Sequence, residues 1–144
     1  SEFGLRPIIL WGPGEEPARD EMLAGLKDAD GFAAPPTRIR ELAVLISLTS
    51  TFVGGDTGPT HLAGLLGIPT VAIFGASDGA RNHPWHSTKT LVVDVEGLAC
   101  RPCWKTQCPL LEERHLACLT TLTPNHVGAK AMPWLMNHLP AYLK

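Results

Sequence analysis

Residues 51–63 read Thr-Phe-Val-Gly-Gly-Asp-Thr-Gly-Pro-Thr-His-Leu-Ala, and this stretch decides the fold of the chain. It predicts a buried strand, a tight turn at Gly54-Gly55 and a helix that begins near Gly58. Glycine lets the backbone approach a ligand closely, and a helix start offers unpaired N–H groups and the positive end of a dipole. In an α/β sheet such a turn lies at the carboxyl end of a strand, where ligands bind. The stretch therefore predicts an anion site, most simply for the phosphates of a nucleotide.

The side chains and amides of this turn are the first candidate site residues. Thr57, Gly58 and Thr60 supply N–H groups and hydroxyls for a diphosphate, although an ordinary capped helix would use the same residue types. Asp56 would repel a diphosphate, so it caps the helix, binds a sugar hydroxyl or holds His61. His61 lies about one turn into the helix and could donate a hydrogen bond or, when protonated, offset phosphate charge. A helical histidine is also commonly an ordinary surface or core residue.

Short apolar runs alternate with helical patterns along the chain, which is typical of a parallel α/β sheet flanked by helices. The last helix is expected to begin after Thr123-Pro124, with Thr123 as its cap, and Pro133 is expected to kink or break it. The patterns predict strands at residues 7–11, 32–34, 51–54, 69–74 and 91–95, helices at 15–27, 37–48 and 58–66, and an irregular segment at 96–122.

Two acids and a threonine in the first third of the chain are further candidates. Glu15 and Glu16 follow a strand and a Gly-Pro-Gly turn, where a carboxylate can accept from both hydroxyls of a ribose, with Glu16 slightly favoured. Acids in a first helical turn also simply stabilise the helix dipole. Pro17 stands where a dinucleotide fingerprint would have its third glycine, so that fingerprint is not supported. Thr37 is a good helix cap, and capping alone is enough to account for a threonine at this position.

The loop at residues 75–88 is rich in hydrogen-bonding groups and follows a strand, as functional loops of α/β folds do. Ser77, Asp78 and Arg81 are candidates for sugar or phosphate contacts. Long polar loops also occur where no ligand binds.

All four cysteines lie in the irregular segment, in the pattern Cys-x2-Cys-x4-Cys-x9-Cys at Cys100, Cys103, Cys108 and Cys118. The first pair fits a zinc knuckle, but the other gaps do not match a double Cys-x-x-Cys ribbon. A structural zinc is therefore not favoured over thiols that pack as small apolar side chains.

The bulk properties exclude several classes of protein. At 144 residues, 44% apolar, with mean hydropathy +0.07 and net charge −2, the chain suits one globular domain and carries no electrostatic footprint for nucleic acid. Residues 101–144 are mildly basic, with five basic and two acidic side chains, which is typical of a solvated face. No apolar run is long enough for a membrane-spanning helix. Residues 1–3 are interpreted as a cloning remnant.

The turn also resembles a known family. Residues 55–63 are similar to the Asp-Thr-Gly-x-x-His segment of the family 9 glycosyltransferases, the bacterial heptosyltransferases of lipopolysaccharide core assembly. Residues 10–16, 34–37 and 69–75 resemble further segments of that family in the same order, which makes the likeness stronger than one short match. The resemblance implies the two-domain GT-B fold, of which residues 4–144 match the C-terminal, nucleotide-sugar-binding domain, with a Cys-containing segment at 96–122.

The resemblance implies transfer of heptose from ADP-heptose to lipopolysaccharide core. The donor-binding residues would be Glu15, Glu16, Thr37, Asp56, Thr57, Gly58, Thr60 and His61. The catalytic base and a phosphate-binding lysine would lie in parts of the enzyme that this chain does not contain, so the chain alone is expected to be inactive, with no metal ligand and no cofactor besides the donor. The acceptor would bind through the N-terminal domain. The resemblance also implies a cytoplasmic protein with peripheral contact to the inner face of the inner membrane.

Two other functions remain open. The same fold also serves nucleotide-sugar epimerases, which would need an acid pair that spans both domains. The chain could instead be a non-catalytic zinc module that interacts through residues 101–144.

Overall fold

The computed structural model describes residues 4–26, 30–85 and 87–140. The chain forms two compact units, residues 1–42 with 140–144 and residues 43–139, and each is described by itself. The expected remnant at residues 1–3 and the expected helix end at Lys27 lie outside the described residues.

The first unit pairs two short parallel strands with one helix. Strand β1 and strand β2 are in register with Ile8 opposite Phe32, which confirms the weakly marked second strand. The elements are β1 (Ile8–Ile9), α1 (Glu16–Gly25) and β2 (Phe32–Ala33).

A tryptophan fastens this unit together. The Trp11 indole N–H donates to the carbonyl of Ala34 at 2.7 Å, and the Arg19 guanidinium of α1 lies 4.4 Å from the centre of the indole ring. The cation–π contact and the hydrogen bond connect α1 to both strands, because Trp11 follows β1 and Ala34 follows β2.

Helix α2 (Ile39–Ser47) crosses the boundary between the units and begins later than the sequence predicts. The Arg38 carbonyl accepts the first helical hydrogen bond, from Leu42 at 2.9 Å, and the Glu41 carboxylate accepts from the Arg38 N–H at 2.7 Å. This is the acidic half of a capping box. The prediction that Thr37 caps the helix is therefore wrong. Arg38 holds the cap position, and the Glu41 carboxylate, in the first helical turn, accepts the Arg38 N–H.

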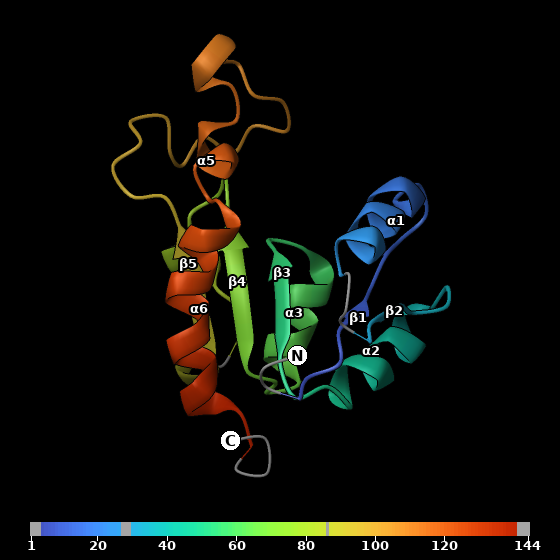
Figure 1. Cartoon of the computed structure of the whole chain (residues 1–144). Helices are drawn as coiled ribbons and strands as arrows, with labels where there is room; N and C mark the ends of the chain where they lie inside the picture. The colour runs from blue at the N-terminus through green and yellow to red at the C-terminus, as the bar shows by residue number, and fades with distance from the viewer. Residues whose placement is uncertain (1–3, 27–29, 86, 141–144) are drawn as a thin grey trace. The chain divides into compact units, whose positions relative to one another are not determined.

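The second unit contains three parallel strands in the order β3 (Phe52–Gly55), β4 (Thr70–Phe74) and β5 (Thr90–Asp94), as Figure 1 shows. Val53 pairs with Val71, and Val71 pairs with Leu91. The parallel sheet expected from the alternating pattern is confirmed. Strand β4 lies between the other two and is buried along most of its length.

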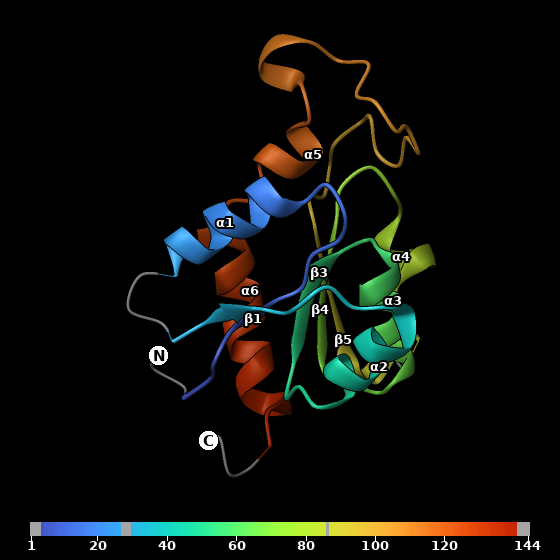
Figure 2. The same ribbon diagram turned by 90° about the vertical axis from the view of Figure 1, so that its right-hand side faces the viewer.

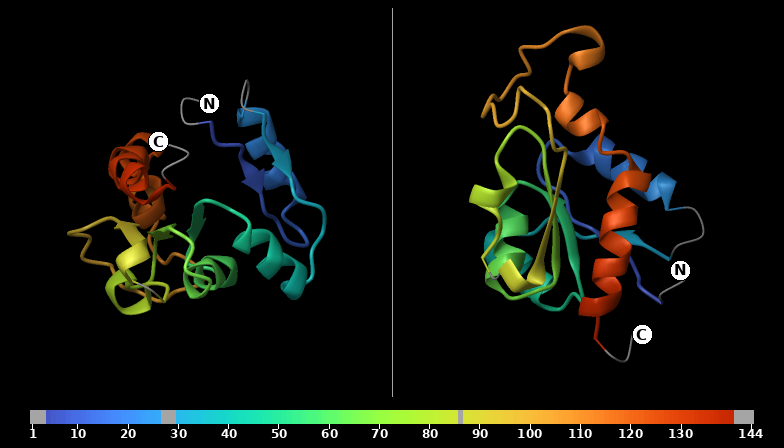
Figure 3. Two further views of the ribbon diagram at one scale, coloured as in Figure 1. Left: turned by 90° about the horizontal axis from the view of Figure 1, so that it is seen from below. Right: turned by 90° about the vertical axis from the view of Figure 1, so that its left-hand side faces the viewer.

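Helices cover both faces of this sheet (Figures 2 and 3). Helix α6 (Pro124–His138) packs on one face, where Val71, Val93, Ala131 and Leu135 form a buried cluster. Helices α3 (Gly58–Leu65) and α4 (Gly79–Asn82) pack on the other face. Residues of a strand alternate between faces, so the valines at 71 and 93 share one face.

Helix α3 ends at a left-handed glycine, as the sequence predicts. Gly67 has φ +72°, and its N–H donates to Gly64 while the next N–H, of Ile68, donates to Ala63, each at 3.0 Å. These two bonds are the Schellman motif, which only a residue tolerant of positive φ closes without strain.

Helix α6 begins as expected and continues past Pro133. Thr123 is its cap, with the hydroxyl accepting from the His126 N–H at 3.2 Å. Pro133 was expected to kink or break this helix; it lies inside the helix, which continues to His138, so the break does not occur. Pro133 lacks the N–H that would bond one turn back, yet the packed residues on either side, Ala131 and Leu135, are buried against the sheet.

The segments expected to be irregular contain short helices that periodicity cannot reveal. They are α4, the 3₁₀ turns η1 (Ser87–Lys89) and η2 (Glu112–Arg114), and α5 (Ala117–Thr120). None of the helices in the described part of the chain is long and apolar enough to cross a bilayer.

Candidate functional site

The turn between β3 and α3 has the predicted strand–turn–helix geometry. Gly55 ends the strand, Thr57 is extended at φ −139°, and Gly58 is the first residue of α3. The Thr57 N–H donates to Gly55 at 2.9 Å, and the amides of Thr60 and His61 both donate to the Thr57 carbonyl. The amide of Gly58, by contrast, makes no hydrogen bond to the described residues. A ligand at the turn would meet the free N–H of Gly58 and the positive end of the helix dipole.

Thr60 takes a structural position rather than the predicted ligand-facing one. Its side chain is fully buried, and its hydroxyl lies 3.4 Å from that of Thr57. A Cβ at Gly54 would lie 2.6 Å from the Thr60 hydroxyl and 2.8 Å from the Phe52 ring. The first glycine of the turn is thus required by packing beneath the turn.

Asp56 accepts hydrogen bonds from two directions. Its Oδ1 lies 3.0 Å from Nε2 of His61, and its Oδ2 accepts from the Ser77 hydroxyl at 2.5 Å. Because a carboxylate only accepts, the His61 ring donates through Nε2–H in this pair. Of the three roles open to Asp56, holding His61 is the one the contacts show. Ser77 follows β4, so the network joins the carboxyl ends of two adjacent strands.

A cavity of about 550 Å³ opens beside this network. Asp56 and Gly55 line it from the end of β3, and Ala76 and Ser77 line it from the loop after β4. Residues 104–106 and Leu119 of α5 complete it. Its size is within the range of small-molecule sites, and it lies at the carboxyl edge of a parallel sheet, where α/β folds bind ligands. Figure 1 shows the segment at 96–122 beyond the ends of β4 and β5.

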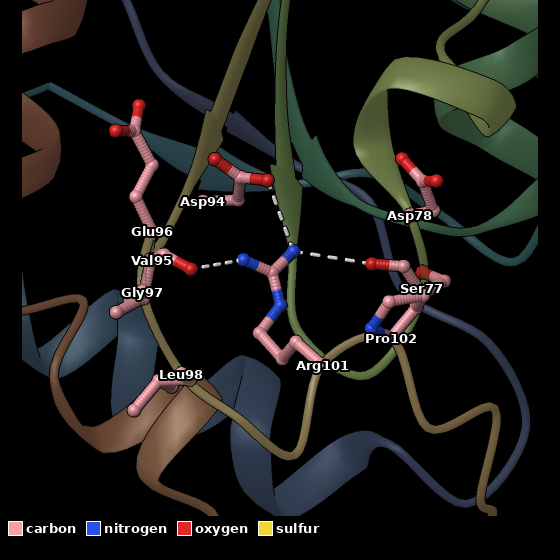
Figure 4. A pocket seen from close by; sticks show the side chains of 9 residues that line it. All are labelled: Ser77, Asp78, Asp94, Val95, Glu96, Gly97, Leu98, Arg101 and Pro102. Carbon is pink, nitrogen blue, oxygen red and sulfur yellow. Dashed lines mark hydrogen bonds and ion pairs between the residues drawn. The ribbon is translucent and has the colours of Figure 1, made fainter.

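A second cavity, of about 280 Å³, is lined by the guanidinium of Arg101, which lies between Asp94, Val95 and Ser77 in Figure 4. The Arg101 side chain is 9% exposed and donates to the carbonyls of Gly75 at 2.6 Å, Ser77 at 3.1 Å and Val95. It also pairs with Asp94 at 3.0 Å. The buried Arg101 side chain bonds four acceptors and so holds the segment after β5 against the loop after β4. These bonds within the protein leave the guanidinium little hydrogen-bonding capacity for a ligand.

The remaining candidates in the loop after β4 divide into one structural residue and one exposed residue. Asp78 caps α4, because its carboxylate accepts from the amides of Ala80 at 2.9 Å and Arg81 at 3.2 Å. The Arg81 side chain makes no hydrogen bond or ion pair with other described residues. Ser77 is the member of the loop that reaches Asp56 and the larger cavity.

Glu15, Glu16 and Thr37 belong to the first unit and the turn belongs to the second. The Glu15 carboxylate accepts from the Gly12 N–H at 2.7 Å, closing the turn before α1. Glu16 is exposed and makes no hydrogen bond to the described residues, so of the two acids its carboxylate is the one left for a ligand.

The four cysteines are free thiols. Across residues 4–26, 30–85 and 87–140, no three His, Cys, Asp or Glu side chains are placed to hold a metal ion. The Cys108 sulfur accepts from the Leu116 N–H at 3.3 Å. Burial raises the pKa of the Cys118 thiol, and the neighbouring Cys103 and Cys100 add to that rise. Cys118 therefore stays protonated at neutral pH.

The parallel sheet flanked by helices defines a Rossmann-like α/β domain, and the family model of glycosyltransferase family 9 (heptosyltransferase) matches residues 1–113. The chain belongs to glycosyltransferase family 9.

Individual relatives agree with this assignment. The lipooligosaccharide heptosyltransferase 2 of Campylobacter jejuni is 35% identical over 101 residues, which cover 70% of this chain and 30% of that protein. The lipopolysaccharide heptosyltransferase 1 of Pseudomonas aeruginosa is 30% identical over 94% of this chain and 40% of its own length. The chain thus spans well under half the length of these relatives.

Solved structures show the same fold. The E. coli ADP-heptose lps heptosyltransferase II superposes with a TM-score of 0.70 and 22% identity over 94% of this chain and 38% of that one. The E. coli heptosyltransferase WaaC with ADP-2-deoxy-2-fluoro heptose superposes with a TM-score of 0.59 and 22% identity over 88% of this chain and 32% of that one. These likenesses confirm the Rossmann-like, GT-B-type architecture expected from the sequence.

Sequence reasoning missed two residues that shape the cavities. Trp104 and Arg101 lie in the segment expected to be irregular, where no periodicity marks a position. The available signal was the first Cys pair, because Arg101 lies between Cys100 and Cys103 and Trp104 directly follows Cys103.

Proposed function

We propose that this chain is the donor-binding part of a glycosyltransferase that transfers heptose from ADP-heptose to lipopolysaccharide core. The observation that carries the proposal is the cavity at the carboxyl edge of the sheet, lined by Asp56 beside the free amide of α3. Membership of family 9 and the names of its relatives support the sugar and the acceptor.

The two ends of such a donor need opposite chemistry, and the turn offers both. The Gly58 N–H and the positive end of α3 attract the diphosphate. The Asp56 carboxylate accepts hydrogen bonds from sugar hydroxyls and is oriented for this by Ser77 and His61. A carboxylate held by two donors keeps its direction without reorganisation when the sugar binds.

In the transfer step an acceptor hydroxyl attacks the anomeric carbon, the bond from that carbon to the diphosphate breaks, and negative charge grows on the leaving diphosphate. The α3 terminus is the group in this chain that stabilises this charge. We assign no catalytic base to the chain and place it in the N-terminal domain, which also binds the acceptor. The chain alone is accordingly proposed to lack transferase activity.

Glu16 and the surroundings of Thr37 are proposed to bind the nucleoside. An exposed carboxylate without a hydrogen-bonding partner can accept from both ribose hydroxyls. Near Thr37 the backbone, rather than the side chain, would read the base edge.

Amide chemical-shift mapping of the isotopically labelled chain with ADP, and with UDP as the control, tests the proposal. We expect ADP to shift the amides of residues 55–61 and 15–16, and UDP to shift them less. An absence of shifts at millimolar ADP, or shifts confined to residues outside both turns, would contradict it.

A further inference from the structure

One wall of the larger cavity comes from the Cys-containing segment and is fixed to the loop that carries Ser77. The amides of Cys103 and Trp104 both donate to the Ala76 carbonyl, at 2.9 and 3.2 Å. Arg101 holds the carbonyls on either side of Ala76, those of Gly75 and Ser77. Three consecutive carbonyls therefore determine the position of Trp104 relative to the cavity.

Trp104 lines the larger cavity together with Asp56, it is 51% exposed, and its backbone has φ +55°. Lys105 and Thr106 also line the cavity, and Glu112 and Leu116 also have positive φ, but among the described residues of the segment Trp104 alone combines the three properties. A left-handed conformation is an outlier for a bulky residue, and such strain concentrates at ligand clamps. The Ala76 carbonyl holds the backbone in this conformation.

We infer that Trp104 is a binding residue for the sugar of a nucleotide-sugar donor, with its indole as a platform for the sugar's C–H face. The inference rests on the proposed function and adds to it a residue of the Cys-containing segment. A sugar offers hydroxyls at its rim and C–H groups on its faces. The Asp56 carboxylate accepts from the hydroxyls, and an aromatic ring packs against the C–H groups, because a ring gives a large, rigid apolar surface at low entropic cost.

The charges of the cavity suit an anionic donor. Asp56 and Lys105 are the two charged side chains among the described residues that line it, and they are of opposite sign. Lys105 is exposed and offsets the repulsion between Asp56 and a diphosphate. A sugar without a diphosphate gains nothing from this cation.

The test compares two ligands, ADP and ADP-2-deoxy-2-fluoro heptose, by calorimetric titration of the 144-residue chain. We expect the wild-type chain to bind the ADP-sugar more tightly than ADP. Trp104→Ala should weaken the ADP-sugar by about fivefold and change ADP by less than about twofold. Trp104→Phe should recover most of the loss, whereas Trp104→Leu, apolar but without a ring, should not.

Trp85→Ala is the matched control, because Trp85 is also an exposed tryptophan of the second unit, at 71%, and does not line the cavity. It should change neither affinity. If Trp104→Ala proves unstable, the Phe and Leu variants still separate a ring from mere apolar bulk.

The outcomes separate the two proposals. An equal loss for both ligands in Trp104→Ala overturns the role of Trp104 and leaves the donor site standing. Equal wild-type affinity for both ligands overturns the role of Trp104 together with the proposed sugar contact of Asp56, and leaves only the diphosphate site standing. Binding of neither ligand by the wild-type chain overturns the proposed function and this inference with it.

Discussion

The Asp56 carboxylate and the Ser77 hydroxyl lie 2.5 Å apart, although 21 positions separate them in the sequence. Each residue follows the end of its own strand, and the two strands are neighbours in the sheet. Parallel strands bring their carboxyl ends to one edge, so the sheet itself creates this contact. The bond fixes the direction of the one acidic group that lines the larger cavity among the described residues.

Replacing Asp56 with Asn should affect the two halves of a donor in opposite directions. The amide removes a negative charge, so ADP should bind as tightly as before or up to about threefold more tightly. The ADP-sugar should bind about tenfold more weakly, because hydrogen bonds to a charged acceptor contribute more than those to a neutral one. Calorimetric titration with both ligands measures this, and an equal loss for both would show that Asp56 acts only through the fold.

The free amide of Gly58 can be removed without disturbing the helix. Proline is favoured at the first helical position, and Thr57 before it is already extended, at ψ 163°. Gly58→Pro should lower the melting temperature no more than Gly58→Ala does, because both variants place a side chain before Pro59. It should weaken ADP by about tenfold, because a hydrogen bond to a charged group is worth about 1.5 kcal/mol or more. Gly58→Ala is the control, because its Cβ meets nothing within 4 Å and its N–H remains. Similar ADP affinities for the two variants would exclude this amide from the phosphate site.

Gly54→Ala should destabilise the second unit by about 2 kcal/mol, because the added methyl overlaps the Thr60 hydroxyl and the Phe52 ring. Gly128→Ala in α6 should instead stabilise the protein by about 0.5 kcal/mol, since nothing lies within 4 Å of its Cβ and alanine favours helix. Urea unfolding of both variants gives the two free energies. If the order were reversed, the packing described under the turn would be wrong.

Arg101→Met should cost about 3 kcal/mol of stability, because it leaves Asp94 and three carbonyls without their shared donor. Amide hydrogen exchange should accelerate in residues 96–106. Arg114→Met is the control, since Arg114 is exposed in the same segment. Exchange rates that stay as in the wild type would mean that the segment is held by other contacts.

The thiols should differ in reactivity. Cys118 is buried and its pKa is raised, so less of it is thiolate at any pH and reagents reach it slowly. We expect iodoacetamide at pH 8 to modify Cys118 last among the four, as timed mass spectrometry would record. Because its pKa is higher in the folded than in the unfolded chain, the thiol leaves stability unchanged at low pH and lowers it as the pH rises above the unfolded value. Equal labelling rates at all four sites would contradict this ordering.

The sequence was most informative about features that hydrophobic periodicity or turn residues specify within a few neighbouring positions. The glycine turn after Phe52-Val53, the Gly67 helix end and the Thr123 cap are each specified by a few adjacent residues, and the structure confirms them. The pairing of Asp56 with His61 was one of three predicted options, because Asp56 directly precedes the helix start and His61 lies in the first turn of the helix.

Long-range and segment-specific features escaped prediction. The contact between Ser77 and Asp56 depends on strand register, and the anchoring of Arg101 depends on carbonyls of a distant loop. The Thr37 cap was wrong because the helix begins at Ile39, which places Arg38 at the cap position, and the Arg38 N–H is bonded by Glu41 from the first turn. Short helices such as α5 contain too few residues to show a period.

The packing of α6 on the sheet has a consequence for any shortened form of the protein. Val71 and Val93 are buried against the helix that begins at Pro124 and the partly buried apolar side chains around it. A chain that stopped before Pro124 would expose a β-branched surface on two adjacent strands, the kind of surface through which separate molecules associate. The last helix therefore keeps the sheet from aggregating as well as keeping it folded.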